Sequence, residues 1–308
     1  MSKKISGTLL SPLFILTAGI LWGCMGLLVR SMTPRGFTSM EIVFFRAVVT
    51  GVLMLILTFS LKRKELKIRW KDLWCFLGTG LASVVFFNFC YFSCIQRAAL
   101  STAAILLYTA PSFLMILSAF LFKERFTLVK VLCLVLTFAG CVLVSGGFGE
   151  MISPSALLLG LGAGFGYALY SVFSRYAIEK GYSSFTITTY TFLFAMVGCL
   201  PFVNPVHFAG CLTESGVWVP VFILLTVLTT VAAYLLYTAG LSGMENSVAG
   251  ILASVEPVVA TLIGVFIFRE SLSLWSFAGI VLVLSSCVLV SLCGRKKSEN
   301  ESVQNDTK

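Results

Sequence analysis

Apolar residues occur in ten long runs along the chain, separated by short connections that hold polar and basic residues. About 20 apolar residues cross the hydrocarbon core of a bilayer, so runs of this length predict membrane-spanning helices. We predict ten such helices, over residues 10–30, 39–61, 73–95, 99–122, 127–146, 154–175, 186–203, 217–239, 247–268 and 274–293. The connections leave no room for a soluble domain. The pattern therefore predicts an all-α integral membrane protein.

The ninth run contains an acid and a proline near its middle. Residues 246–270 have the sequence NSVAGILASVEPVVATLIGVFIFRE, which places Glu256 and Pro257 close to the bilayer centre. A charge at that depth costs roughly 2.5–3.5 kcal/mol on insertion scales, so a functional role is the default expectation. At helical spacing the face of Glu256 also carries small residues, namely Ala249, Ala253, Ala260 and Gly264. We therefore expect Glu256 to face neighbouring helices, and not lipid.

This stretch has a counterpart 146 residues earlier. Ser101–Glu124 aligns with Ser247–Glu270 without a gap, so that Pro111 matches Pro257 and Glu124 matches Glu270. An internal repeat of this length indicates two similar halves. The acid belongs to the second half only, because Ala110 occupies the position of Glu256.

Each predicted half contains an odd number of helices, five, so the second half enters the membrane with the opposite orientation. We predict two inverted five-helix repeats, over residues 10–146 and 154–293, followed by a disordered tail over 294–308. This architecture is typical of secondary transporters, whose substrate sites lie near the midplane between the repeats. Pro111 and Pro257 are the predicted hinges for rocking of one half against the other.

Composition and charge support the membrane assignment. Hydrophobic residues make up 58% of the chain, charged residues make up 11%, and the net charge is +9. The basic residues lie in clusters between apolar runs, which argues against nucleic acid as a partner. With the N-terminus inside, 17 of the 22 Lys and Arg residues lie on the inner side and four on the outer side. This bias predicts a multi-pass protein of the inner or plasma membrane with both termini cytoplasmic.

The sequence lacks the motifs of common enzymatic sites. It contains neither GxxxxGK[ST] nor HExxH, and its single histidine, His207, falls in the 204–216 connection. The ten cysteines form no CxxC pair and lie mostly inside apolar runs, as buried structural cysteines do. We expect no enzymatic activity, no cofactor and no metal, and any driving force would come from a gradient.

Arg46 and Asn88 are the other strongly polar candidates inside predicted helices. Arg46, in the second helix, could receive a substrate carboxylate through its paired donors, or it could extend to headgroups or pair within the bundle. Asn88 and Tyr91 lie one turn apart in the third helix. Substrate contact and hydrogen bonding between helices account for Asn88 equally well.

Aromatic residues in mid-helix are candidates for a pocket wall. Trp22 lies inside the first helix, whereas tryptophans of membrane proteins are usually interfacial. Tyr108 and Tyr234 add hydroxylated rings that suit an amphiphilic solute, although general helix packing explains such rings too. Glu256 likewise has two interpretations, as a hydrogen-bonded structural acid or as a site of proton coupling or substrate contact.

Ten helices in two inverted halves, with Ala110-Pro111 and Glu256-Pro257 at matching positions, resemble the drug/metabolite transporter superfamily. Lys123-Glu124 and Arg269-Glu270, which close the fourth and ninth helices, extend the resemblance to its EamA-type ten-helix exporters. It covers residues 10–293. The resemblance implies export of amino acids or other small metabolites through a central cavity lined by helices 1–4 and 6–9, with helices 5 and 10 peripheral.

Three functions fit the sequence. We favour an exporter of small metabolites, with amino acids or related carboxylate-bearing solutes preferred because of Arg46. Efflux of drugs or organic cations is the alternative within the transporter class. A non-transporting receptor or assembly subunit is the alternative from another class, for which the 204–216 loop offers the only surface. The expected partners are a small-molecule substrate and membrane lipid, and a homodimer is left open.

Overall fold

The computed structural model describes residues 2–146 and 153–306, together with the side chains of 10–146 and 153–292. All secondary structure in these residues is helical. Nine helical segments are long and apolar enough to cross a membrane, and the helix Leu128–Val144 is a shorter apolar one. The prediction of a ten-helix membrane protein is therefore confirmed.

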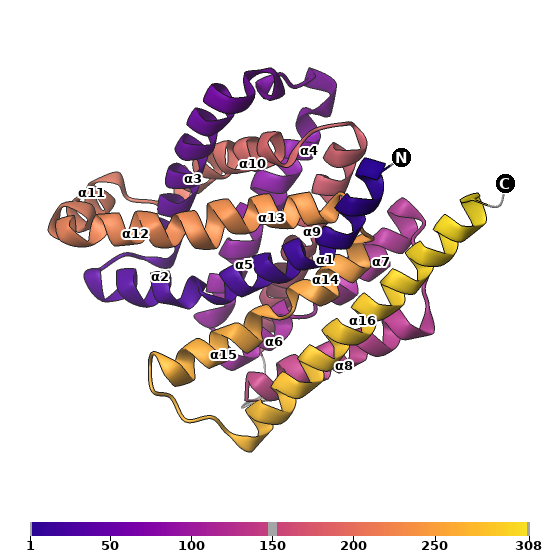
Figure 1. Ribbon diagram of the computed structural model, residues 1–308. Helices are drawn as coiled ribbons and strands as arrows, with labels where there is room; N and C mark the ends of the chain where they lie inside the picture. The colour runs from indigo at the N-terminus through magenta and orange to yellow at the C-terminus, as the bar shows by residue number, and fades with distance from the viewer. Residues whose placement is uncertain (1, 147–152, 307–308) are drawn as a thin grey trace.

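The first half contains four of the long segments and the shorter helix Leu128–Val144, and its α-helices are drawn in Figure 1. Most of them are interrupted by a break or a change of helix type. Its elements are α1 (Ser2–Gly23), α2 (Met25–Met32), α3 (Ser39–Lys62), α4 (Leu73–Leu77), the π-helix η4 (Gly78–Val85), α5 (Phe86–Ile95), α6 (Leu100–Leu107), α7 (Ala110–Phe122) and α8 (Leu128–Val144), with short 3₁₀ turns at Thr33–Arg35, Arg63–Leu66 and Trp70–Asp72.

The second half follows a similar order, except that its first span, Pro154–Glu179, is one unbroken helix and the helix Pro205–Glu214 has no counterpart in the first half. Its elements are α9 (Pro154–Glu179), α10 (Ser184–Cys199), α11 (Pro205–Glu214), α12 (Val219–Thr226), the π-helix η7 (Val227–Ala232), α13 (Ala233–Leu241), α14 (Asn246–Ala253), α15 (Glu256–Phe266) and α16 (Leu274–Asp306), with 3₁₀ turns at Leu200–Phe202 and Gly216–Trp218.

Two elements of the second half differ from the sequence prediction. The 204–216 connection contains the helix α11, which Pro205 begins and which the side chain of Asn204 caps by accepting from the backbone N–H of Val206 and His207. Proline at the first position and Asn as the N-cap are standard helix-start signals that we had treated as loop residues. The helix α16 continues through residues 294–306, where we expected a disordered tail.

The repeat is visible in the backbone. α6 ends at Leu107 and α7 begins at Ala110, and α14 ends at Ala253 and α15 begins at Glu256, again 146 residues apart. Each half also contains one π-helical segment in its third helix, η4 in the first half and η7 in the second. Departures from α-helix that recur in both halves belong to the architecture, because a random defect would not repeat.

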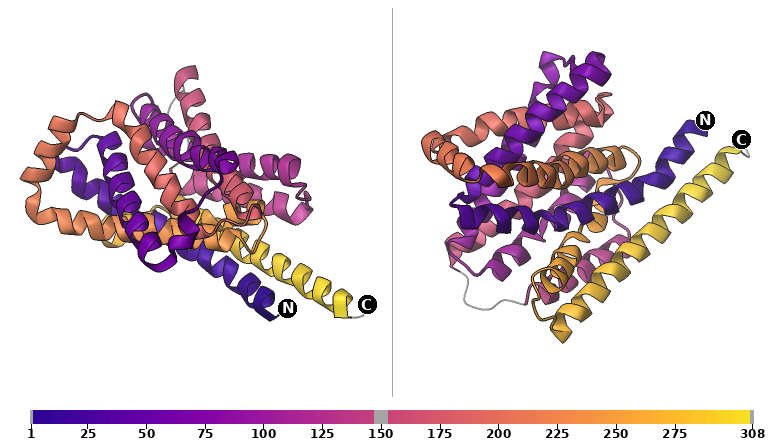
Figure 2. Two further views of the ribbon diagram at one scale, coloured as in Figure 1. Left: turned by 90° about the horizontal axis from the view of Figure 1, so that it is seen from above. Right: turned by 60° about the vertical axis from the view of Figure 1, so that its left-hand side comes forward.

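The two chain termini lie at the same end of the bundle (Figures 1 and 2). We call this end the terminal face; α3, α7, α9 and α13 end there. We call the other end the opposite face; α2, α5 and α15 end there, and α11 covers part of it. On the terminal face Lys180 donates to Asp72 at 2.8 Å, which raises the pKa of Lys180 above its usual value.

The fifth and tenth helices pair at the edge of the molecule. α8 and α16 lie side by side along one flank (Figure 1). Gly140 and Gly279 allow the close approach, since a Cβ on Gly140 would lie 2.8 Å from the carbonyl oxygen of Gly279. The hydroxyls of Thr137 and Ser286 form a buried hydrogen bond of 2.6 Å across the pair. The remaining eight segments surround the centre of the bundle.

Candidate functional site

The ninth helix is broken beside Glu256. The backbone N–H of Ser254 donates to the carbonyl of Ile251 at 3.2 Å, and that of Val255 donates to Leu252 at 3.3 Å, so the chain tightens into a turn between α14 and α15. Glu256 is then the first residue of a new helix. Our expectation of one helix through this region is corrected. The break places free N–H groups and the positive end of a helix dipole at the centre of the bundle.

The break also divides the small-residue face predicted from the sequence. Ala249, Ala253 and Gly264 are buried, but Ala260, in the first turns of α15, is exposed. The close neighbour is α1. A Cβ on Gly19 would lie 2.9 Å from the carbonyl oxygen of Ala253.

Gly23 continues this contact one turn further along α1. A Cβ added on Gly23 would lie 2.7 Å from the carbonyl oxygen of Glu256 and 2.6 Å from Cβ of Val259. Two glycines four residues apart on α1 therefore allow it to rest on the broken backbone, as in close helix crossings of membrane proteins.

Glu256 lies where the two halves meet. The Tyr167 hydroxyl, from α9, donates to Glu256 Oε2 at 3.2 Å. Both residues line a small pocket to which the first half contributes Tyr108 and Pro111. The breaks of the two halves therefore face each other across the pocket. In the sequence Tyr167 is one of several tyrosines within apolar runs, and nothing there distinguishes it as the partner of Glu256.

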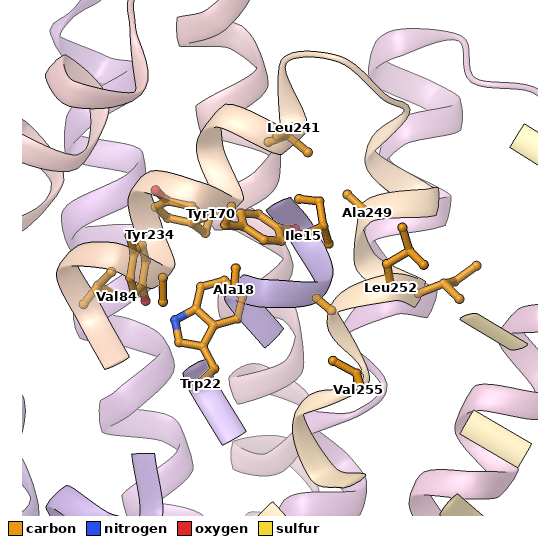
Figure 3. Close-up of a cluster of buried hydrophobic side chains, with 14 of the residues drawn as sticks. Ile15, Ala18, Trp22, Val84, Tyr170, Tyr234, Leu241, Ala249, Leu252 and Val255 are labelled. Carbon is orange, nitrogen blue, oxygen red and sulfur yellow. The ribbon is translucent and has the colours of Figure 1, made fainter. Parts of the chain in front are cut away.

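Aromatic rings surround the end of α1 at the bundle centre. The ring centroid of Trp22 lies 5.2 Å from that of Tyr234 and 5.9 Å from that of Tyr167, in edge-to-face arrangements. Figure 3 shows Trp22 and Tyr234 directed toward each other, with Tyr170 beside them. Trp22 and Tyr234 are both buried in the main hydrophobic cluster. At these distances the positive edge of one ring is attracted to the negative face of the next, and this attraction favours a fixed arrangement of the rings.

Arg46 projects from α3 toward the second half. Its Nε donates to Thr230 Oγ1 at 3.0 Å, in the π-helix η7. Among the described residues no carboxylate lies within 4.0 Å of the guanidinium, so Arg46 forms no ion pair there. Glu256 and Tyr234 are nevertheless near enough to act on it electrostatically. A basic and an acidic side chain therefore face the same interior without forming an ion pair.

Asn88 and Tyr91 contribute to helix packing. The Asn88 side chain is buried and donates through Nδ2 to the carbonyl of Val84 on the same helix at 2.7 Å, where η4 passes into α5. The ring of Tyr91 packs beside Phe87 and Phe92, with centroids 6.0 and 5.7 Å away. The side-chain hydrogen bond that the structure shows for Asn88 is thus within its own helix, and contact of Asn88 with a substrate stays a prediction.

The predicted hinge prolines are both in the first turn of a new helix. Pro111 follows Ala110 at the start of α7, and Pro257 follows Glu256 at the start of α15. Proline fits this position, because the N–H it lacks would have no partner within the helix. Each break therefore lies just before its proline.

A bundle of ten membrane helices, with a broken helix in each half and charged groups at the meeting point of the halves, is the architecture of a secondary transporter. The chain belongs to the EamA-like transporter family, which matches residues 9–146 and 154–292. The protein is therefore a multi-pass membrane transporter.

Several relatives share this architecture in sequence. The Bacillus subtilis (strain 168) uncharacterized transporter YwfM is 27% identical over 94% of this chain and 96% of its own. An uncharacterized transporter of Archaeoglobus fulgidus is 30% identical over 68% of this chain and 75% of its own. A crystal structure of a protein with 20% identity superposes with a TM-score of 0.76 over 93% of this chain and 98% of the other, which supports the fold.

Proposed function

We propose that the protein exports small metabolites that carry a carboxylate, amino acids among them, by alternating access between its two halves. We place it in the cytoplasmic membrane with both termini in the cytoplasm. The bias of Lys and Arg toward the terminal side supports this orientation.

The observation that carries the proposal is that Arg46, which donates to Thr230 but pairs with no carboxylate among the described residues, faces the same interior as Glu256. A charge inside a bundle costs several kcal/mol when it has no partner, so such a residue is expected to meet one during function. The planar guanidinium fork matches a carboxylate in a bidentate arrangement. Glu256 would receive the ammonium group of an amino acid, and the rings of Trp22 and Tyr234 would cover its apolar part.

The comparison with the first half argues that Glu256 is functional and not structural. The break between α6 and α7 forms with Ala110 at the position of the acid, so a carboxylate is not needed to make this backbone. The helix start at α15 would form equally well without it. What Glu256 adds is a charge that can bind a proton or a cationic group at the contact of the two halves.

Efflux from proteoliposomes tests the proposal. Vesicles loaded with a labelled amino-acid mixture would be followed with and without a pH gradient, for wild type, Glu256→Gln and Arg46→Ala. We expect saturable efflux that both substitutions reduce, and partial recovery in Arg46→Lys. Glu179→Gln, an exposed acid at the end of α9, is the matched control. Absence of efflux for every carboxylate-bearing solute, from folded protein, would refute the proposal.

A second candidate, efflux of organic cations, is favoured by one feature of the site. Glu256 lies in a pocket with Tyr108 and Tyr167, and Trp22 packs against Tyr167. A carboxylate among aromatic faces suits a cation. Arg46 distinguishes the two candidates: Arg46→Ala would weaken transport of carboxylates but leave or increase transport of cations, because it removes a like charge.

A further inference from the structure

The turns that end α7 and α15 have the same backbone. Lys123 and Arg269 are both in the left-handed region with φ of 56°. The next residue in each turn is a glutamate, whose backbone N–H donates back into its own helix: Glu124 to Ser118 at 3.2 Å, and Glu270 to Gly264 at 3.0 Å. Glu124 and Glu270 are 146 positions apart. The repeated turn therefore places one carboxylate at each face of the bundle.

On the terminal face this carboxylate closes the contact between the halves. Glu124 accepts from the backbone N–H of Asn246 at 2.6 Å, from the backbone N–H of Ser247 at 3.2 Å and from the Ser247 hydroxyl at 2.5 Å. These groups form the start of α14, and the side chain of its N-cap, Glu245, does not cap it. The Glu124 side chain is only 9% exposed. A buried anion on the free N–H groups of a helix start is a strong contact.

Two basic residues reinforce this contact. Lys130 lies 3.8 Å from Glu124 and forms an ion pair of 2.5 Å with Glu245. Arg175, at the end of α9, donates to the Asn246 side chain at 2.8 Å and to the carbonyl of Met244. The start of α14 is therefore held from both halves.

On the opposite face the equivalent contact is open. The positions that correspond to Asn246 and Ser247 are Leu100 and Ser101, the first residues of α6, and the N-cap residue Ala99 has no side chain able to cap them. Glu270 instead pairs with Arg30 at 2.6 Å, and about half of each side chain is exposed. The same carboxylate is thus buried and engaged at one face, but solvated and displaced at the other.

We propose that Glu124 and Glu270 are alternating gate residues. Glu124 on the start of α14 holds the terminal face closed in the present conformation. When the opposite face closes, Glu270 caps the start of α6 at Leu100 and Ser101, and the contact of Glu124 with α14 opens. Arg30 retains Glu270 near the opening in the meantime. This assignment rests on alternating access in the proposed function, but it concerns positioning of the halves and not the substrate.

Hydrogen exchange of the full chain in lipid nanodiscs, without substrate, tests the gate. In Glu124→Gln we expect amides of α14 to exchange roughly fivefold faster or more, since a helix cap is lost. Amides of α6 should exchange more slowly by a comparable factor, because Glu270 now caps them. A purely structural role for Glu124 would accelerate α14 and leave α6 unchanged, and this result would overturn the proposal.

A double variant identifies the residue responsible. Adding Glu270→Gln to Glu124→Gln should remove the new protection of α6 while α14 stays fast. Protection of α6 that persists in the double variant would exclude Glu270 as its cause. Ser247→Ala, which removes only the hydroxyl contact, should show the same pattern at smaller amplitude, and Glu179→Gln should show neither change. These measurements need no transported solute, so a failed transport assay and a failed gate are separate outcomes.

Discussion

The broken helices of the two halves have the same backbone but different chemistry. α6–α7 and α14–α15 break at equivalent residues and resume before a proline. Both breaks line the same pocket, where the first break presents the methyl group of Ala110 and the second presents the carboxylate of Glu256. The two halves therefore share the backbone break, and the acidic side chain of Glu256 is found in the second half only. Four experiments test this difference between the halves.

Moving the acid from one break to the other should have the largest effect. Glu256→Ala should reduce transport by roughly a hundredfold, because removal of one buried charged partner costs several kcal/mol. In Ala110→Glu combined with Glu256→Ala the carboxylate is restored on the first half, on the other wall of the same pocket, and we expect little recovery of efflux from proteoliposomes. Recovery to near wild-type rates would show that the halves are interchangeable, contrary to our interpretation.

Overpacking the contact of α1 with the second break should have the next largest effect. Gly23→Leu places a side chain where Cβ alone would lie 2.7 Å from the Glu256 carbonyl oxygen. We expect a loss of about 1–3 kcal/mol of stability, typical of overpacking, together with impaired transport. Thermal unfolding in detergent measures the loss of stability. Gly26→Leu is the control in the same segment, since its Cβ would meet nothing within 4 Å.

Removing the partner of the acid should have a moderate effect. Tyr167→Phe deletes the hydroxyl that donates to Glu256 Oε2 but keeps the ring beside Trp22. A net loss near 1 kcal/mol corresponds to roughly a fivefold change in apparent substrate affinity. The concentration dependence of efflux measures it. Tyr176→Phe, on the same helix, is the matched control, and an equal effect there would remove any special role for Tyr167.

Replacing the prolines should have the smallest effect. Pro111→Ala and Pro257→Ala restore an N–H in the first turn of α7 and α15, where it needs no helical partner. We expect stability to change by less than about 1 kcal/mol. If both breaks act as hinges, transport rates should fall by similar, few-fold factors in both variants. A strong effect of one proline alone would confine the hinge to that half.

Much of the fold could be predicted from the sequence because it follows from composition and repetition. The ten apolar runs and the match of Ser101–Glu124 with Ser247–Glu270 define the helices and the repeat. Pro111 and Pro257 mark both breaks in the sequence, but a proline inside an apolar run fits a kink in one helix as well as the start of a new helix, so the breaks themselves were not predicted. The breaks form where the chain packs against glycines of another helix. The spacing of apolar residues along the sequence gives no information on that contact.

The candidate site was predicted only in part, for a similar reason. Four of the predicted residues lie at the centre of the bundle, as we expect for polar and aromatic residues in mid-helix: Trp22, Tyr108, Tyr234 and Glu256. Tyr167 is 89 positions from the acid that it contacts, and Glu124 is 122 positions from the helix start that it caps. The first contact depends on how α9 and α15 pack within the second half, and the second contact depends on how the two halves dock. The roles of Arg46 and of the hinges stay predictions.

The π-helical segments have a consequence for the tolerance of the chain to changes in length. In a π-helix the hydrogen bonds close over one residue more than in an α-helix, so η4 and η7 each contain a surplus residue inside a membrane span. Deleting one residue from Gly78–Val85 can convert that segment to regular α-helix without rotating the flanking faces. The third and eighth spans are thus the places where this transporter can lose a residue during evolution and keep its lipid-facing and interior-facing surfaces in register.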